Sequence, residues 1–293
     1  MIADEGREDK RLGDETDVAR TGAAPRFLIP DWPAPRRVRA AVSTRSGGVS
    51  APPWDGLNLG SHVGDDPAAV AANRRLLAEA LGLARQPVWL EQVHGTHVLV
   101  LGGDPATDPP TDPPTDSTAD AALTRERGQV CGVMTADCLP VLLCDRAGTV
   151  VAAAHAGWRG LAAGVLRQTV TAMGVAPEDI LAWLGPAIGP RRFEVGGEVR
   201  AAMLDNAIDA GQRRLIPACF TPSPAADGKL LADIYALARA ELASLGVVSV
   251  YGGGLCTVTD TVRWYSYRRD GVTGRMAALV WLEGAPASGA AHS

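Results

Sequence analysis

Short runs of apolar residues alternate along this chain with segments in which apolar positions recur at helical spacing. The short runs predict strands at 88–93, 130–134, 141–144, 149–154, 180–184, 247–251 and 276–282. The helical spacing predicts helices at about 66–82, 160–173 and 231–245. Strands that alternate with helices indicate a mixed α/β domain rather than an all-α or all-β one.

The clearest of these helices has its start and its end marked in the sequence GDDPAAVAANRRLLAEALGL. Asp66 is a capping residue, Pro67 suits the first helical turn, and Gly82 stops the apolar periodicity. We therefore expect a helix between Asp66 and Gly82.

Three polar or small-residue segments divide the chain. Residues 1–26 are densely charged and lack apolar periodicity, so we expect a disordered N-terminal arm. Residues 104–118 repeat Thr-Asp-Pro-Pro, which favours an extended surface loop, and residues 284–293 are small and polar enough for a flexible tail. We expect the remaining residues, 27–283, to form one catalytic domain.

The composition narrows the class of partner. The chain has 293 residues, 46% of them hydrophobic, and a formal charge of -5. Such a chain can bury a sizeable core, but it lacks the basic surface that nucleic-acid binding requires. We expect a small-molecule substrate, no nucleic acid and no membrane; the composition leaves the oligomeric state open.

The five cysteines are unevenly spaced and lie mostly in apolar runs, which favours a reducing compartment over a disulfide framework. The charged N-terminal segment lacks the apolar core of a secretory signal, and no apolar stretch reaches the length of a membrane span. We therefore expect a cytoplasmic protein.

Three residues with metal-binding side chains stand where an apolar run breaks into a turn. His94 lies in LEQVHGTHV, Cys138 in VMTADCLPVLLC and His155 in VVAAAHAGWRG. Two imidazoles and one thiolate would give a metal ion three ligands and leave a fourth position open, as in catalytic zinc sites. Structural zinc sites usually contain Cys-x-x-Cys pairs, and this chain has none. All three residues are therefore candidate metal ligands and catalytic residues.

Each candidate also has a structural interpretation. A cysteine in an apolar run is often a small buried side chain, which is our interpretation of Cys131, Cys144 and Cys219. A histidine is often a hydrogen-bonded structural imidazole. His97 is an alternative ligand to His94, and His62 is a weaker one from a loop.

Neighbouring charged residues offer supporting roles. Asp137 and Glu91 can orient an imidazole or move a proton, or they can be ordinary turn carboxylates. A helix that begins after His155 would direct free amide groups, together with Arg159, at an anion. Arg159 can equally be a surface arginine.

The same segments resemble a known family. STRSGGVS, LNLGSHVGDDP, VWLEQVHGTHV, VMTADCLPVLLC, AAAHAGWRGLAAGVL, WLGPAIGPRRFEVGGEV and WYSYRRDGVTGRM look like motifs of the YfiH family, also called the polyphenol oxidase or laccase-domain-containing family. The resemblance extends from about residue 38 to residue 282. The N-terminal arm and the Thr-Asp-Pro-Pro segment depart from it.

The resemblance implies a single-domain α/β fold, with a mixed β-sandwich core flanked by helices, and a zinc ion bound by His94, Cys138 and His155. It also implies a purine nucleoside phosphorylase that acts on adenosine, inosine, guanosine and methylthioadenosine and has adenosine deaminase activity. Two other family labels compete with this one: a copper polyphenol oxidase, and a peptidoglycan editing factor that removes wrongly built cell-wall precursors.

The number of histidines tests whether the chain can be a multicopper polyphenol oxidase. A blue-copper site needs two histidines and a cysteine, and a multicopper oxidase ligates three further copper ions. The chain has five histidines, and one of them, His292, lies in the tail. A complete multicopper centre cannot be assembled, although copper remains possible as an alternative occupant of the His-Cys-His site.

The two implied reactions need further groups. Deamination needs an activated water, which zinc with an open position supplies. Phosphorolysis needs a site for phosphate, and planar guanidinium groups suit its oxygens. Trp158 either stacks on a purine or packs the turn. We expect the substrate and phosphate contacts to come from Arg45, Arg159, Arg268, Asn58 and Gln92.

Three hypotheses follow from the sequence. The favoured one is a zinc-dependent purine nucleoside phosphorylase and adenosine deaminase. The alternative is a hydrolase that edits peptidoglycan precursors, with either a zinc-bound hydroxide or a Cys138 thiolate paired to a histidine. The third is a binding protein in which the metal only stabilises the fold.

Overall fold

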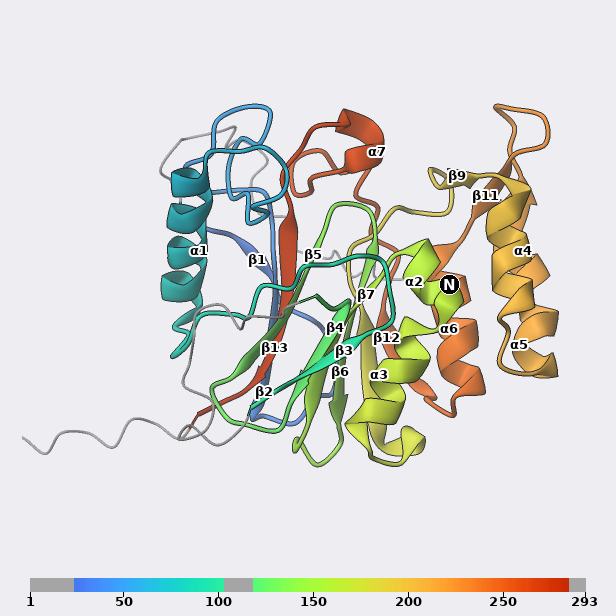
Figure 1. Ribbon diagram of the computed structural model, residues 1–293, viewed down its shortest axis with the longest axis horizontal. Helices are drawn as coiled ribbons and strands as arrows, with labels where there is room; N and C mark the ends of the chain where they lie inside the picture. Colours follow the sequence, from blue (N-terminus) through green and yellow to red (C-terminus); the bar gives the residue numbers. More distant parts are fainter. Residues whose placement is uncertain (1–23, 103–117, 285–293) are drawn as a thin grey trace, which may run out of the picture.

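The computed structural model describes residues 24–102 and 118–284. The expected N-terminal arm, Thr-Asp-Pro-Pro loop and tail lie outside the described residues, except for their edge positions 24–26, 118 and 284. The described elements form four layers: one helix, two sheets face to face, and a second group of helices (Figure 1). The expected mixed α/β fold with a β-sandwich core is confirmed.

The two large sheets form the sandwich. The smaller has the order β1-β2-β13-β5 and is antiparallel throughout, and the larger has the mixed order β12-β8-β6-β7-β4-β3. The first comprises β1 (Phe27–Leu28), β2 (Val38–Ser43), β13 (Met276–Leu282) and β5 (Val130–Thr135). The second comprises β12 (Ser249–Gly252), β8 (Ile180–Leu184), β6 (Leu139–Asp145), β7 (Val151–Ala156), β4 (Ala121–Thr124) and β3 (Val98–Leu101).

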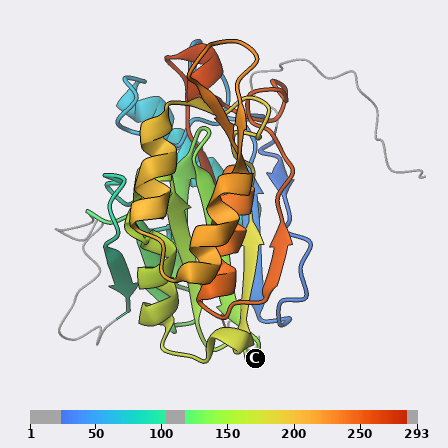
Figure 2. The same cartoon turned by 90° about the vertical axis from the view of Figure 1, so that its right-hand side faces the viewer.

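Helices cover both outer faces. The helix α1 (Pro67–Leu81) packs through Leu77 against β5 and β13, and the long α3 and α6 pack on the far face of the larger sheet (Figures 1 and 2). The helices on that side are α2 (Trp158–Ala163), α3 (Val165–Met173), α4 (Gly197–Asp205), α5 (Ala210–Leu215) and α6 (Ile234–Ser244); the short α7 (Tyr267–Asp270) lies in a loop before β13. A small sheet of β10 (Phe220–Pro222), β11 (Leu230–Ala232) and β9 (Glu194–Val195), and 3₁₀ turns at Pro177–Asp179 and Ile216–Cys219, complete the described elements.

The alternation of side chains along β7 decides which way His155 faces. Ala152, Ala154 and Ala156 contact the helices, whereas Val151 and Ala153 pack between the two sheets. Because successive side chains of a strand point to opposite faces, His155 shares the face of Val151 and Ala153. The sequence therefore directs this imidazole into the end of the sandwich.

Most of the predicted elements are confirmed, with shifts at their ends. Asp66 caps α1 by accepting a hydrogen bond from the Ala68 amide, and Gly82 ends the helix at φ 60°. The predicted helix 160–173 is two helices, because Gly164 at φ 95° interrupts it.

The predicted strand 88–93 is wrong. Only Glu91 forms an isolated bridge there, with Thr118, and Gln92 pairs by its side chain with the backbone of Met134. Val93 is more than half exposed, so this apolar run packs as a loop rather than inside a sheet.

All five cysteines are free in the structure. Among the described residues, no helix combines the length and the apolar character needed to cross a bilayer.

Candidate metal centre

Three loops or strand ends bring His94, Cys138 and His155 together at one end of the sandwich. His94 lies in the loop before β3, at φ 61°, a left-handed conformation that is uncommon for a residue with a side chain. Cys138 lies in the turn between β5 and β6, and His155 is the penultimate residue of β7. The ligand atoms of the three residues all lie within 4.8 Å of one another.

The distances suit a single metal ion. The Cys138 Sγ lies 3.7 Å from the His94 Nε2, and the two imidazole rings meet edge to face with their centroids 4.8 Å apart. A tetrahedral zinc ion holds a sulfur and a nitrogen ligand about 3.6 Å apart. The donor set of two imidazoles and one thiolate matches catalytic zinc or a single copper ion, and it leaves one coordination position for a reactant.

Asp120 orients this cluster, and we did not expect it from the sequence. Its fully buried carboxylate accepts a hydrogen bond from the His155 Nδ1 at 2.8 Å. It also accepts hydrogen bonds from the backbone amides of Val93, His94 and Gly95. One carboxylate therefore fixes the tautomer of His155, with the Nε2 left free for a metal, and holds the loop that carries His94.

The charges in the cluster favour a thiolate. Burial alone would raise the pKa of the Cys138 thiol, but the positive charge of His155 and hydrogen bonds from both imidazoles lower it to about 6. Burial alone would lower the pKa of His155, but the Cys138 thiolate and Asp120 raise it to about 9. These opposite shifts favour a thiolate and an imidazolium over the neutral pair, and a metal cation can replace the proton between them.

Gly157 leaves the space in which the ligands meet. It follows β7 and caps α2, and a Cβ atom at this position would lie 2.8 Å from the His94 Cδ2 and 3.0 Å from the Cys138 Sγ. Its φ of -62° is open to any residue, so the steric limit comes from the cluster and not from the backbone. The absence of a side chain at Gly157 leaves space beside the three donor atoms, and this space can accommodate a bound ion or reactant.

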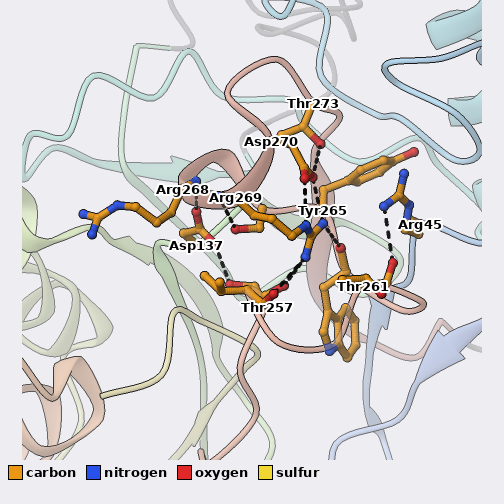
Figure 3. Close-up of polar contacts among 12 residues, drawn as sticks. Arg45, Asp137, Thr257, Thr261, Tyr265, Arg268, Arg269, Asp270 and Thr273 are labelled. Carbon is orange, nitrogen blue, oxygen red and sulfur yellow. Dashed lines mark hydrogen bonds and ion pairs between the residues drawn. The ribbon is translucent and has the colours of Figure 1, made fainter. Parts of the chain in front are cut away.

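Asp137 is next to Cys138 but holds a different part of the structure. Its Oδ1 accepts a hydrogen bond from the Thr257 hydroxyl at 2.5 Å, and its Oδ2 accepts one from the Arg268 amide at 2.6 Å (Figure 3). With φ at 101°, Asp137 turns the chain so that its carboxylate points at the loop before β13. The same loop is further held by Arg269, whose guanidinium donates to the carbonyls of Thr257 and Trp264 and forms an ion pair with Asp270.

The expected substrate contacts are distributed around this end of the fold. Arg45 forms an ion pair with Asp55 and lies over the Tyr265 ring (Figure 3), and the Arg268 side chain donates to the Glu194 carbonyl. Arg159 is exposed and stacks on Trp158.

The two amides have structural partners. Asn58 is fully buried and bonds to the backbone of Gly60 and Arg275, and Gln92 bonds to the backbone of Met134. His97 bonds to the Thr118 carbonyl and is not part of the cluster. His94 is thus the histidine of this loop that joins Cys138 and His155.

A family model described as multi-copper polyphenol oxidoreductase laccase matches residues 39–283. The chain belongs to this family. It is the YfiH family that the motifs resemble, since similar curated proteins include the purine nucleoside phosphorylase YfiH of Escherichia coli (strain K12), 54% identical over 88% of this chain and 99% of that protein. The purine nucleoside phosphorylase PA4543 of Pseudomonas aeruginosa is 56% identical over 88% of this chain and 98% of its own length.

Solved structures of the YfiH family share the fold. Neisseria meningitidis protein NMB0706 superimposes with a TM-score of 0.77 at 49% identity, covering 88% of this chain and 99% of its own. YlmD from Geobacillus stearothermophilus gives a TM-score of 0.76 at 31% identity, covering 92% of this chain and 98% of its own. Within residues 24–102 and 118–284, His94, Cys138 and His155 form the one cluster of three or more His, Cys, Asp or Glu side chains placed to hold a metal ion.

Proposed function

We propose that this protein is a zinc-dependent purine nucleoside phosphorylase that also deaminates adenosine. The observation that carries the proposal is the cluster of two imidazoles and a thiolate beside Gly157, in a chain 54–56% identical to proteins named purine nucleoside phosphorylase. The substrates are purine nucleosides, namely adenosine, inosine, guanosine and methylthioadenosine, together with inorganic phosphate.

In the phosphorolysis, a phosphate oxygen forms a bond to the ribose C1′ while the bond from C1′ to the purine N9 breaks. The bonding electrons leave with the base, which takes up a proton, and the products are the free purine and ribose 1-phosphate, or 5-methylthioribose 1-phosphate from methylthioadenosine. In the deamination, water replaces the amino group at the purine C6 and ammonia leaves. Both reactions need an anionic or water nucleophile held beside the purine nucleoside.

The protein residues hold and orient the reactants. When bound, zinc would lower the pKa of a coordinated water to roughly 7 and polarise an oxygen of the substrate. Before the ion binds, the neighbouring imidazolium lowers the pKa of Cys138, so that a thiolate is available as a ligand. Asp120 holds the Nδ1 proton of His155, so that the Nε2 of this residue can face the ion.

The test uses the full chain loaded with zinc. Adenosine with phosphate should yield adenine and ribose 1-phosphate, and adenosine without phosphate should yield inosine. Cys138→Ala should lose most of the bound zinc and nearly all turnover while it keeps its fold. If zinc-loaded protein leaves all four nucleosides unchanged, the proposed function is wrong.

One observation favours a second candidate. The Cys138 pKa of about 6 makes the thiolate available as a nucleophile, as a hydrolase acting on peptidoglycan precursors would use it. Chelation separates the two candidates, since the phosphorylase should lose activity when its metal is removed. Hydrolysis of a cell-wall precursor that survives chelation would support the thiolate mechanism instead.

A further inference from the structure

Arg275 is a charged residue at the end of the smaller sheet that lies nearest the metal cluster. It directly precedes β13, whose first residue, Met276, pairs with Thr135 at the end of β5. This antiparallel register places Arg275 opposite the turn that carries Cys138. The electrostatic influence of the Cys138 and Asp137 charges reaches Arg275, although burial is the larger effect and lowers its pKa.

The position of Arg275 is fixed at both the backbone and the side chain. Its amide donates to the Asn58 Oδ1 at 2.9 Å, and its carbonyl accepts from the Leu59 amide at 3.1 Å. Its aliphatic stem lies on Gly60, where a Cβ atom would come within 2.7 Å of the Arg275 Cγ. The loop therefore keeps a glycine where the arginine stem crosses it.

The guanidinium is only partly satisfied. Its Nη1 donates to the carbonyls of Thr273 and Gly274, each at 3.1 Å. In the described part of the chain, no carboxylate forms an ion pair with Arg275, and its Nε and Nη2 have no hydrogen-bond partner. Among the described residues, the Trp264 Nε1 is the one buried side-chain nitrogen or oxygen without a hydrogen-bond partner. The unpaired N–H groups of Arg275 are therefore not buried but accessible to solvent or to a ligand.

Three other arginines of this region have their charges paired with a carboxylate. Arg45 pairs with Asp55, Arg269 with Asp270, and Arg263 with Asp260. A half-buried cation with no carboxylate in direct contact costs free energy, and an anionic ligand that binds to it offsets this cost. The Nε and Nη2 edge of a guanidinium also matches two oxygens of a tetrahedral oxyanion.

We propose that Arg275 binds the inorganic phosphate that attacks the nucleoside at the His94–Cys138–His155 cluster. This inference deepens the proposed function and rests on it for the identity of the anion. Arg275 holds the phosphate through two N–H groups and carries no proton in the reaction. It is a binding residue that the expected set of Arg45, Arg159 and Arg268 did not contain.

The first test measures kinetics on the zinc-loaded full chain, with phosphate and adenosine varied separately. Arg275→Met keeps the stem on Gly60 and should raise the KM for phosphate about tenfold or more, because charge-assisted hydrogen bonds are lost. The KM for adenosine should change less than about twofold, because Arg275 does not contact the nucleoside in this proposal. A general loss of structure would instead change both KM values. Arg275→Lys keeps the charge and should give an intermediate KM for phosphate.

Two further variants control the comparison. Arg263→Met removes an arginine of the same loop that is already paired with Asp260, and both KM values should stay at the wild-type level. Arg159→Met tests the other candidate, at the start of α2. If Arg159→Met raises the KM for phosphate while Arg275→Met does not, the anion binds at α2 and the proposal for Arg275 is overturned.

The second test does not depend on turnover. Inorganic phosphate should raise the Tm of the zinc-loaded wild type and of Arg263→Met, and it should leave the Tm of Arg275→Met unchanged. If the wild type shows this shift but no phosphorolysis, the anion site stands and the proposed function fails. An equal phosphate shift in Arg275→Met and the wild type overturns the role of Arg275. Should Arg275→Met fail to fold, a wild-type KM for phosphate in Arg275→Lys would do the same.

Discussion

Asp120 and His155 face each other across neighbouring strands, with the carboxylate Oδ1 2.8 Å from the imidazole Nδ1. The contact follows from the pairing of β4 with β7, in which Ala121 lies opposite Ala154 and the His155 amide donates to the Asp120 carbonyl at 2.7 Å. The side chains are thus aligned by the backbone of the sheet itself. A metal ligand held in this way cannot rotate away from the cluster.

The first prediction concerns Asp120→Asn. The asparagine amide can donate to the His155 Nδ1, which favours the tautomer with its proton on the Nε2 and removes the lone pair that binds a metal. We expect the affinity for zinc to fall about 10-fold to 100-fold. Titration with a competing chelator measures it. Glu91→Gln is the control, because the Glu91 carboxylate accepts a hydrogen bond from Thr118 and not from the cluster. This variant should bind zinc like the wild type. Equal losses of zinc affinity in both variants would count against a specific role for Asp120.

The second prediction concerns Gly157→Ala. The added Cβ meets the His94 Cδ2 and the Cys138 Sγ, so the ligands have to separate, while the backbone at φ -62° accepts alanine. We expect zinc binding to weaken by about 1–3 kcal/mol, as in other overpacked sites, with little change in the stability of the metal-free protein. Metal content and chemical denaturation measure the two quantities.

Gly197→Ala is the matched control for Gly157→Ala. Gly197 lies at the first position of α4, and a Cβ there has no neighbour within 4 Å. This variant should bind zinc like the wild type. Wild-type affinity in Gly157→Ala would show that the ligands tolerate the methyl group and that the free volume has no role in binding.

The sequence marked His94, Cys138 and His155 as candidate ligands because each stands at a local break between an apolar run and a turn, and the resemblance to the YfiH family implied the same three residues. Asp120 gave no such signal, since it lies close to the acidic Thr-Asp-Pro-Pro repeat and resembles its neighbours. Its contact with His155 depends on the register of β4 against β7, and Arg275 depends on the register of β13 against β5. Pairing between distant strands cannot be deduced from one sequence.

The fold shows the same division. The helix from Asp66 to Gly82 and the strands β5, β6, β8 and β13 have clear local patterns and were predicted. The strand β4 was missed because its four residues follow directly on the polar repeat, and the three-stranded sheet was missed because its strands have two or three residues each. Such short elements are stabilised by their neighbours rather than by their own sequence.

The third prediction separates two roles for Asp137. Both of its carboxylate oxygens accept hydrogen bonds from the 257–268 loop, so we expect it to act by positioning that loop. Asparagine tolerates the left-handed backbone at φ 101° and can keep both contacts. Asp137→Asn should therefore keep turnover within about tenfold of the wild type, measured on zinc-loaded protein. A folded variant that loses about a thousandfold or more would assign Asp137 to proton transfer.

The last prediction concerns Glu241, a carboxyl group buried between α6 and α3. Burial raises its pKa to about 7, while a hydrogen bond from the Arg167 amide and the Arg167 charge oppose the shift. In the unfolded chain the group titrates near its ordinary pKa of 4.5, so the folded state holds the extra proton between the two values. The free energy of unfolding should fall as the pH rises from about 4.5 to 7, by about 3 kcal/mol from this group, and then level off.

Glu241→Gln keeps the acceptor for the Arg167 amide without the charge. This variant should therefore be more stable than the wild type above pH 7, and its free energy of unfolding should lose the dependence on pH that Glu241 causes. Denaturant unfolding at pH 5 and pH 8 measures the difference, with the exposed Glu79→Gln as the control. If wild type and Glu241→Gln have the same pH slope, the carboxyl group is not buried in the neutral form.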